Sequence, residues 1–119
     1  MLLFVATELY PIVEINDYPE RFTPGSLAAS EVREVARTIW RERWLIVNDA
    51  IDGDPFLLNW GYCITDMYIA VVSRWAQQDD WRREHLRKVE ALTDAVAMEA
   101  SAMEAWTRHR PSDTPGRFQ

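Results

Sequence analysis

Cys63 and Asp66 come nearest, by residue type and spacing, to a reactive site in this sequence. A cysteine at the amino end of a helix meets the positive end of the helix dipole, which favours the nucleophilic thiolate. Asp66, three residues later, opposes that effect, and we expect Tyr62 and Met67 to cover the thiol. A buried cap is therefore favoured over a nucleophile, and the sequence predicts no catalytic residue.

The two histidines are the other candidates for chemistry. His85 and His109 both lie among charged residues, and neither has a second histidine or a cysteine at the spacing of metal ligands. The sequence also contains no phosphate-binding glycine loop and no Ser-His-Asp arrangement. It therefore predicts no metal site and no cofactor held by this chain.

Composition points to one folded, acidic domain. Of 119 residues, 48% are apolar and six are tryptophan, and the net charge is -6 from 13 basic and 19 acidic side chains. A negative chain repels phosphate backbones unless its basic residues gather on one surface. Four arginines do gather, but glutamates alternate with them, so a helix face laced with ion pairs is favoured over a nucleic-acid site. The residues concerned are Arg33, Arg37, Arg41 and Arg43, with Glu31, Glu34 and Glu42.

The sequence predicts a cytoplasmic protein without membrane contact. No apolar run approaches the ~18 residues of a membrane span. The segment Met1–Tyr10 has no basic start, and Glu8 interrupts it, so we expect no signal peptide. A single cysteine cannot form an intrachain disulfide, which fits a reducing compartment.

Apolar spacing in the first half of the chain predicts two helices. The first runs over 2–16, is apolar on more than one side, and should be kinked by Pro11. After a loop over 17–25, a long helix capped by Ser26 or Ser30 should reach about residue 51, with Gly53 as its left-handed cap. Its core stripe is expected to be Val32, Val35, Ala36, Ile39, Trp40, Ile46, Val47 and Ala50.

The second half predicts a buried central helix and a closing helical region. Residues 64–76 are almost free of charge, as expected of a helix at the centre of a domain. Helix resumes at Trp81 and either continues to the end of the domain or restarts at Ser101. We therefore predict an all-α bundle of four to five helices over 1–109, followed by a flexible tail over 110–119. Trp40 and Trp44, one turn apart, mark a candidate exposed patch for a partner.

The start of the central helix carries a specific capping pattern. With Cys63 as the N-cap, the Asp66 carboxylate can reach back to the Cys63 backbone N–H, and Tyr62 and Met67 occupy the positions of a hydrophobic staple. This arrangement is structural. A thiol is a weaker acceptor than a hydroxyl, so we expect Cys63→Ser to raise stability by about 0.5–1 kcal/mol.

The same stretch resembles the C-terminal, all-helical domain of the glutathione S-transferases (GSTs). Pro55-Phe56-Leu57, Tyr62 and Asp66 match the family pattern, and Cys63 stands where Ser or Thr is usual. Leu9-Tyr10-Pro11 and the segment 18–22 are similar to the end of the first helix of that domain. The resemblance covers about residues 2–109.

The resemblance implies a substrate-side role without catalysis by this chain alone. In the family, a preceding thioredoxin-like domain binds glutathione, the co-substrate, and activates its thiol; no such pattern occurs in these residues. The helical domain supplies the wall of the pocket for a hydrophobic electrophile, and it helps to form a homodimer or packs on the thioredoxin-like domain. The residues that the resemblance assigns to the wall are Tyr10, Glu14, Ile15 and Tyr18.

Other interpretations remain open at the level of the sequence. The same four residues could instead pack against the other domain or a second subunit. Similar helical domains also serve as stand-alone protein-interaction modules, and the apolar first helix would suit that role. A truncated reading frame with no function of its own is a third interpretation.

Overall fold

The computed structural model describes residues 1–75, 78–99, 104 and 108, and the regular secondary structure within them is helical. The only β-type pairing described is an isolated bridge between Leu58 and Gly61. The predicted all-α fold is confirmed. The elements in chain order are α1 (Leu2–Phe4), the π-helical turn η1 (Val5–Leu9), α2 (Tyr10–Asp17), the 3-10 turn η2 (Pro19–Arg21), α3 (Ser26–Ala50), α4 (Ile64–Val72), α5 (Asp79–His85) and α6 (Arg87–Met98).

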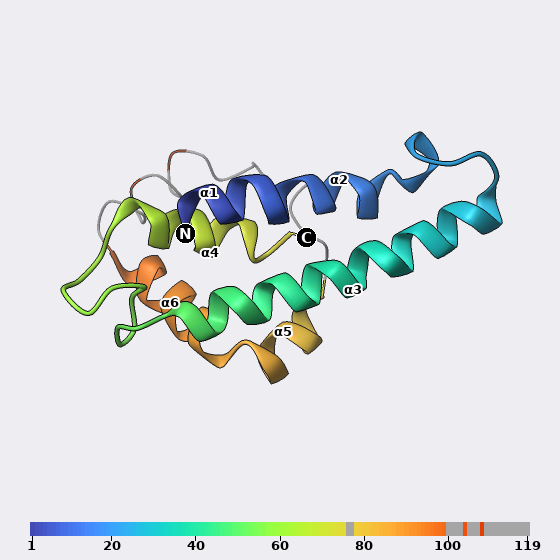
Figure 1. Cartoon of the computed structure of the whole chain (residues 1–119). Coiled ribbons are helices and arrows are strands. Elements are labelled where there is room, and N and C mark those ends of the chain that lie inside the picture. Colours follow the sequence, from blue (N-terminus) through green and yellow to red (C-terminus); the bar gives the residue numbers. More distant parts are fainter. Residues whose placement is uncertain (76–77, 100–103, 105–107, 109–119) are drawn as a thin grey trace.

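The helices form two packed layers. α1, η1 and α2 follow one another as one rod beside α3, and the two run in opposite directions, as Figure 1 shows. α4 packs on η1 and α6, and α6 also contacts α3, so the core lies between the α2–α3 pair and the α4–α6 pair. The largest fully buried side chains are Trp40, Trp44, Leu9, Ile51, Ile69, Leu86, Leu92, Val5, Val47, Val72, Val89 and Val96.

The first helix widens into a π-helical turn just before its proline. The Tyr10 backbone N–H donates to the Val5 carbonyl oxygen, five residues earlier. Pro11 has no N–H to donate and its ring crowds the preceding turn, so the predicted distortion takes this form. Arg43 of α3 donates to the Glu8 carbonyl oxygen at 2.6 Å, which satisfies an acceptor inside the wide turn.

Both predicted caps of the long helix are wrong. Gly25, with φ 88°, occupies the N-cap position and Ser26 is already the first helical residue. The helix ends at Ala50, and Gly53 does not adopt a positive φ. Gly53 is needed because a Cβ there would overlap the carbonyl oxygens of two residues in the following loop, Phe56 and Leu58.

The central helix is shorter than predicted, since α4 ends at Val72 rather than at residue 76. The N–H groups of Arg74 and Trp75 bond three residues back, which tightens the chain into a turn. Buried Arg82 of α5 donates to the Ser73 carbonyl oxygen at 3.1 Å and makes a close charge contact with Glu90. Arg82, nine residues after Ser73 in the sequence, therefore stabilises the chain at the end of α4.

The closing helical region is divided at Leu86, a break that the sequence prediction missed. Leu86 is buried with φ -113° and ψ 56°, between α5 and α6. Asn48 of α3 accepts the backbone N–H groups of Lys88 and Val89 at 3.0 and 3.2 Å. The first turn of α6 is thus capped by a side chain from another helix.

The tryptophans of the long helix belong to the core. Trp40 and Trp44 are both 0% exposed, so the predicted exposed patch is wrong. Their rings lie 5.8 Å apart, and Trp40 meets the edge of Trp81 at 5.9 Å. Trp81 of α5 therefore packs directly on Trp40.

Some predictions fall outside the described part of the chain. The helix start at Ser101 and the tail over 110–119 are among them, and Glu104 and Arg108, which are described, form an ion pair. None of the described helices is long and apolar enough to cross a membrane.

Candidate functional site

Asp66 is the buried anchor of the region that the sequence singled out. It is 0% exposed, and its two carboxylate oxygens accept the backbone N–H groups of Cys63 and Leu57, each at 2.8 Å. The first bond closes the capping box of α4, and the second ties the loop after α3 to that helix. Tyr62 and Met67 are half-buried against the core, and Tyr62 meets Phe56 edge-on.

Three of the four residues assigned to the pocket wall form a row on one side of the first helix. Tyr10, Glu14 and Tyr18 are spaced by four residues, which places them on one face of α2 and its C-cap. All three are exposed, Tyr10 by 51% and Tyr18 by 47%. We call this row, with the two neighbours described next, the tyrosine face.

Two further side chains complete the tyrosine face. Trp75, from the turn after α4, meets the Tyr10 ring edge-on with centroids 5.3 Å apart. Arg21, from η2, pairs with Glu14 at 3.1 Å and lies over the Tyr18 ring at 4.2 Å. The face therefore offers two aromatic surfaces and a cation held by a carboxylate, which suits a partly apolar ligand.

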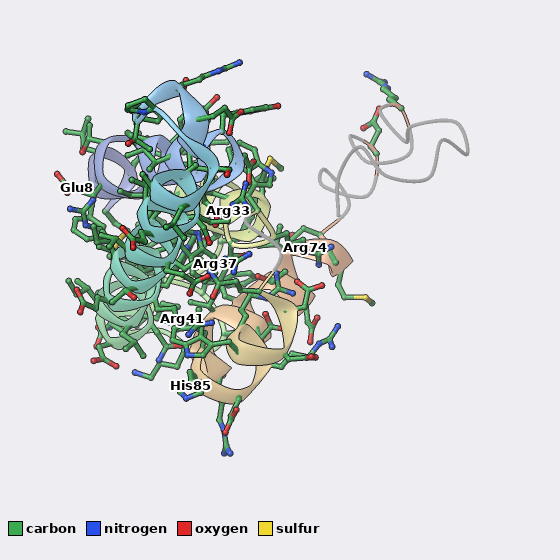
Figure 2. The ribbon with its side chains drawn as sticks, turned by 90° about the vertical axis from the view of Figure 1, so that its right-hand side faces the viewer. Glu8, Arg33, Arg37, Arg41, Arg74 and His85 are labelled. Atoms are coloured by element: carbon green, nitrogen blue, oxygen red, sulfur yellow. The ribbon has the colours of Figure 1, made fainter. Side chains whose placement is uncertain are left out.

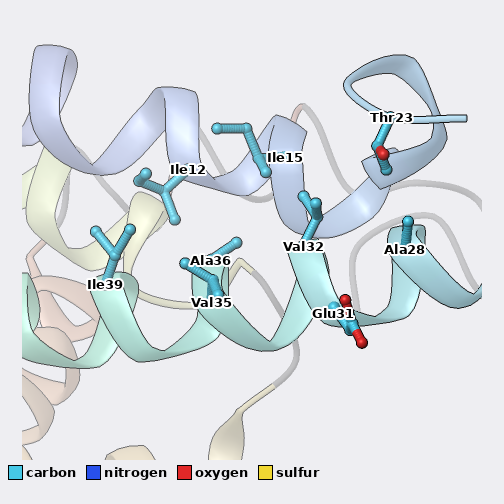
Figure 3. A pocket seen from close by; sticks show the side chains of 9 residues that line it. All are labelled: Ile12, Ile15, Thr23, Ala28, Glu31, Val32, Val35, Ala36 and Ile39. Atoms are coloured by element: carbon cyan, nitrogen blue, oxygen red, sulfur yellow. The ribbon is translucent and has the colours of Figure 1, made fainter.

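Ile15 lies on a different side of α2 from the tyrosine face. It lines an open groove between α2 and α3 with a volume of ≈ 460 Å³, shown in Figure 3. The groove walls are mostly aliphatic. Its lining residues are Ile12, Ile15, Thr23, Ala28, Glu31, Val32, Val35, Ala36 and Ile39.

The arginines of α3 are held by oxygen atoms of several kinds. Arg33 donates to the Asn16 carbonyl oxygen at 2.9 Å, which caps the end of α2, and Arg37 pairs with Glu34 at 3.0 Å. Arg41 donates to the Gln78 side chain at 2.6 Å. Figure 2 shows these arginines on the side of α3 away from Glu8. Only some of these arginines therefore form the ion pairs that the sequence predicted.

The remaining chemistry-bearing side chains have structural contacts. The exposed His85 ring stacks on Trp81, with centroids 4.8 Å apart, and its Nδ1 lies 3.0 Å from the Trp81 carbonyl oxygen. Cys63 is half-buried. Within the described residues, no group of three His, Cys, Asp or Glu side chains is placed to hold a metal ion.

Sequence reasoning missed Trp75, Arg21 and the groove. The sequence analysis placed Trp75 at the end of the central helix and Arg21 in a loop. Tertiary packing brings Trp75 to Tyr10 and Arg21 to Tyr18. The sequence analysis placed Val35 and Ile46 in the core stripe of α3, but they are 59% and 54% exposed, so this part of the prediction is wrong, and Val35 lines the groove instead.

Comparison with known proteins finds a GST-like relative of this chain. The chain is 20% identical over 109 residues to an uncharacterised GST-like protein, YncG, of Escherichia coli K12. This chain is similar to a GST-like protein. The match covers 92% of the chain but only 52% of that relative, so the chain spans about half of the relative's length. No protein-family model matches the chain, and no solved structure matches it.

Proposed function

We propose that this chain is the helical, substrate-side half of a GST-like protein. The similarity to such a protein runs through 92% of the chain while covering only about half of the relative, and this observation carries the proposal. The fold supports it, because α4 is the buried central helix and is opened by the Asp66 capping box.

The tyrosine face is the proposed wall of the substrate pocket. Tyr10 and Trp75 present an edge-to-face aromatic pair, against which an aryl electrophile can stack. Arg21, held between Glu14 and Tyr18, can attract the polar part of such a ligand. Ile15, on the groove side, is left out of this wall.

Catalysis by the whole protein would need a second unit. Glutathione is the proposed co-substrate, and a thioredoxin-like domain the proposed partner that activates its thiol. The hydrophobic electrophile would lie between that domain and the tyrosine face. A homodimer and a cytoplasmic location belong to the same proposal.

Turnover and ligand binding test different parts of the proposal. With glutathione and a chlorodinitrobenzene acceptor, we expect the chain alone to show no saturable turnover, since the wall holds no thiol-activating group. The chain should still bind unreactive dinitrobenzene, measured by calorimetry, and Tyr10→Ala should weaken that binding by about 3- to 10-fold.

A matched substitution controls for general effects of removing an exposed side chain. Leu27 is highly exposed on α3 and is neither a member of the tyrosine face nor a lining residue of the groove, so Leu27→Ala should bind as wild type. Equal affinities of the Tyr10 and Leu27 variants would reject the tyrosine face as the wall. Saturable turnover by the pure chain would reject the two-unit scheme.

A stand-alone interaction module is the second candidate function. Exposed apolar side chains at the starts of α1 and α4, Leu3 and Ile64, and in the loop before α4, Trp60, favour it. It predicts no binding of dinitrobenzene and a tight complex with another protein in which these three side chains become buried.

A further inference from the structure

Three arginines form a row along α3. Arg33, Arg37 and Arg41 are spaced by four residues, so each lies about one helical turn, about 6 Å, beyond the previous one. Figure 2 shows them following one another in the direction of His85. None of the three lines the groove between α2 and α3, so they belong to a different surface. We call these three residues the arginine row.

Oxygen atoms of neighbouring segments hold each guanidinium of the row through its Nε atom. Arg33 donates to the Asn16 carbonyl oxygen at 2.9 Å, and Arg37 donates to the Asn16 side-chain oxygen at 3.3 Å. Arg41 donates to the Gln78 side-chain oxygen at 2.6 Å. Nε is only one nitrogen of the guanidinium fork, so the terminal nitrogens keep donors whose orientation is already fixed. The row therefore loses less side-chain freedom on binding a ligand than mobile surface arginines would.

Two of the three arginines keep a charge without an ion-pair partner. Arg37 pairs with Glu34 at 3.0 Å. Arg33 and Arg41 form no ion pair with any residue that the structure describes, and the oxygens that hold them belong to neutral amide groups. In a chain with a net charge of -6, the row is thus a local surface of positive charge. Such a surface attracts an anionic ligand.

The spacing of the two unpaired charges describes the ligand that would fit them. Arg33 and Arg41 are eight residues apart on one helix, which corresponds to about 12 Å along its axis. Two carboxylates eight residues apart on another helix have the same spacing, and ridges of residues four apart are the ones by which helices commonly pack. A carboxylate can also accept two parallel bonds from one guanidinium, which adds geometric specificity to the charge.

A nucleic acid fits the row less well than an acidic peptide does. A duplex carries one negative charge per ~1.7 Å, so about seven charges would face the ~12 Å between two unpaired arginines. The net charge of -6 would repel the remaining phosphates. A peptide segment with two carboxylates meets the two arginines one for one.

We propose that the arginine row binds an acidic helical segment of a partner protein, with two carboxylates eight residues apart that pair with Arg33 and Arg41. A neutral polar side chain midway between the carboxylates faces the Arg37–Glu34 pair. The row contains no residue of the tyrosine face, so the proposal does not depend on the substrate role.

Two labelled peptides of identical composition are the probes. Both are alanine-rich helices of about 20 residues with two glutamates and one glutamine. In the matched peptide the glutamates are eight residues apart with the glutamine midway; in the scrambled peptide they are two residues apart and point to different sides of the helix. By fluorescence anisotropy at ~0.05 M salt, we expect saturable binding of the matched peptide, at least about threefold tighter than that of the scrambled peptide.

Substitutions on the chain locate the binding surface. Arg41→Gln removes one unpaired charge and should weaken binding of the matched peptide at least about threefold, whereas Arg41→Lys keeps the charge and should weaken it less. Arg83 is an exposed arginine of α5 outside the row, with Asp80 at 3.5 Å. Arg83→Gln makes the same change in net charge and should leave the affinity within about 1.5-fold. Circular dichroism checks that each variant remains folded.

Four results would overturn the proposal. Equal effects of Arg41→Gln and Arg83→Gln would mean that binding reflects net charge alone. Equal affinities for the two peptides would remove the role of spacing, and a matched peptide that does not bind saturably would remove the site. An oligodeoxythymidylate of about ten residues that binds more tightly than the matched peptide, and that Arg41→Gln weakens, would assign the row to a nucleic acid instead.

Discussion

At the scale of the residue, Asp66 is the side chain on which the region around α4 depends. It is fully buried, and each of its carboxylate oxygens accepts a backbone N–H at 2.8 Å, one at the helix cap and one in the loop after α3. Two segments nine residues apart are thereby fixed to each other. Both of these contacts are structural.

Removing this carboxylate should destabilise the fold strongly. In Asp66→Ala, the Cys63 and Leu57 N–H groups lose their acceptor in a buried place, so we expect a loss of about 2–4 kcal/mol in the free energy of unfolding. Urea denaturation followed by circular dichroism measures it. Asp94→Ala, an exposed change on α6, should cost less than about 0.5 kcal/mol. Similar losses in the two variants would contradict the proposed role of Asp66.

A substitution at the N-cap of α4 should raise the stability of the fold. Cys63 is half-buried in extended geometry, with φ -140° and ψ 170°, which is the usual conformation of an N-cap. Serine accepts a hydrogen bond better than a thiol, so Cys63→Ser should raise stability by about 0.5–1 kcal/mol. The midpoint of thermal unfolding reports the change, and an unchanged or lower midpoint would count against it.

At the scale of the element, the boundary between α5 and α6 depends on Asn48 of α3. Its side-chain oxygen accepts the N–H groups of Lys88 and Val89, two of the free donors at the start of α6. Asn48→Ala should therefore cost about 1–2 kcal/mol in the free energy of unfolding, measured in urea.

The neighbouring residue provides the control for this element. Asp49 is exposed on the same turn of α3 and makes no ion pair with the described residues, so Asp49→Ala should change the unfolding free energy by less than about 0.5 kcal/mol. If Asn48→Ala changed the unfolding free energy as little as Asp49→Ala, the packing of Leu86 alone would position the start of α6.

Apolar spacing predicted the helices better than their ends. The helical periodicity of α3 and the uncharged body of α4 were enough to locate both elements. Their limits were missed where a distant partner decides them: Asn48 starts α6, and Arg82 supports the chain after α4. The sequence predicted Gly53 to be a left-handed cap. In the structure, glycine is required there because the loop backbone comes too close to leave room for a Cβ.

The site was predictable only through spacing along one helix. Tyr10, Glu14 and Tyr18 share a face because they are four residues apart, which the sequence shows. Ile15 lies on the groove side, and Trp75 reaches Tyr10 through tertiary packing between residues 65 positions apart. Local periodicity contains no information about such contacts.

At the scale of the whole molecule, the first helix presents two distinct surfaces in different directions. The tyrosine face joins α2 to the turn after α4, and the groove joins α2 to α3. The sequence left open what would cover the first helix. In the proposed function the tyrosine face serves the substrate, and the groove between α2 and α3 is a separate surface.

The central claim is that the tyrosine face is the substrate wall, and nuclear magnetic resonance tests it most directly. Titrating the isotope-labelled chain with dinitrobenzene should shift the backbone amides of Tyr10, Glu14 and Tyr18 and the indole N–H of Trp75, with the groove amides at Ile15 and Val35 unchanged. Shifts confined to the groove, or no saturable shifts at all, would contradict the account.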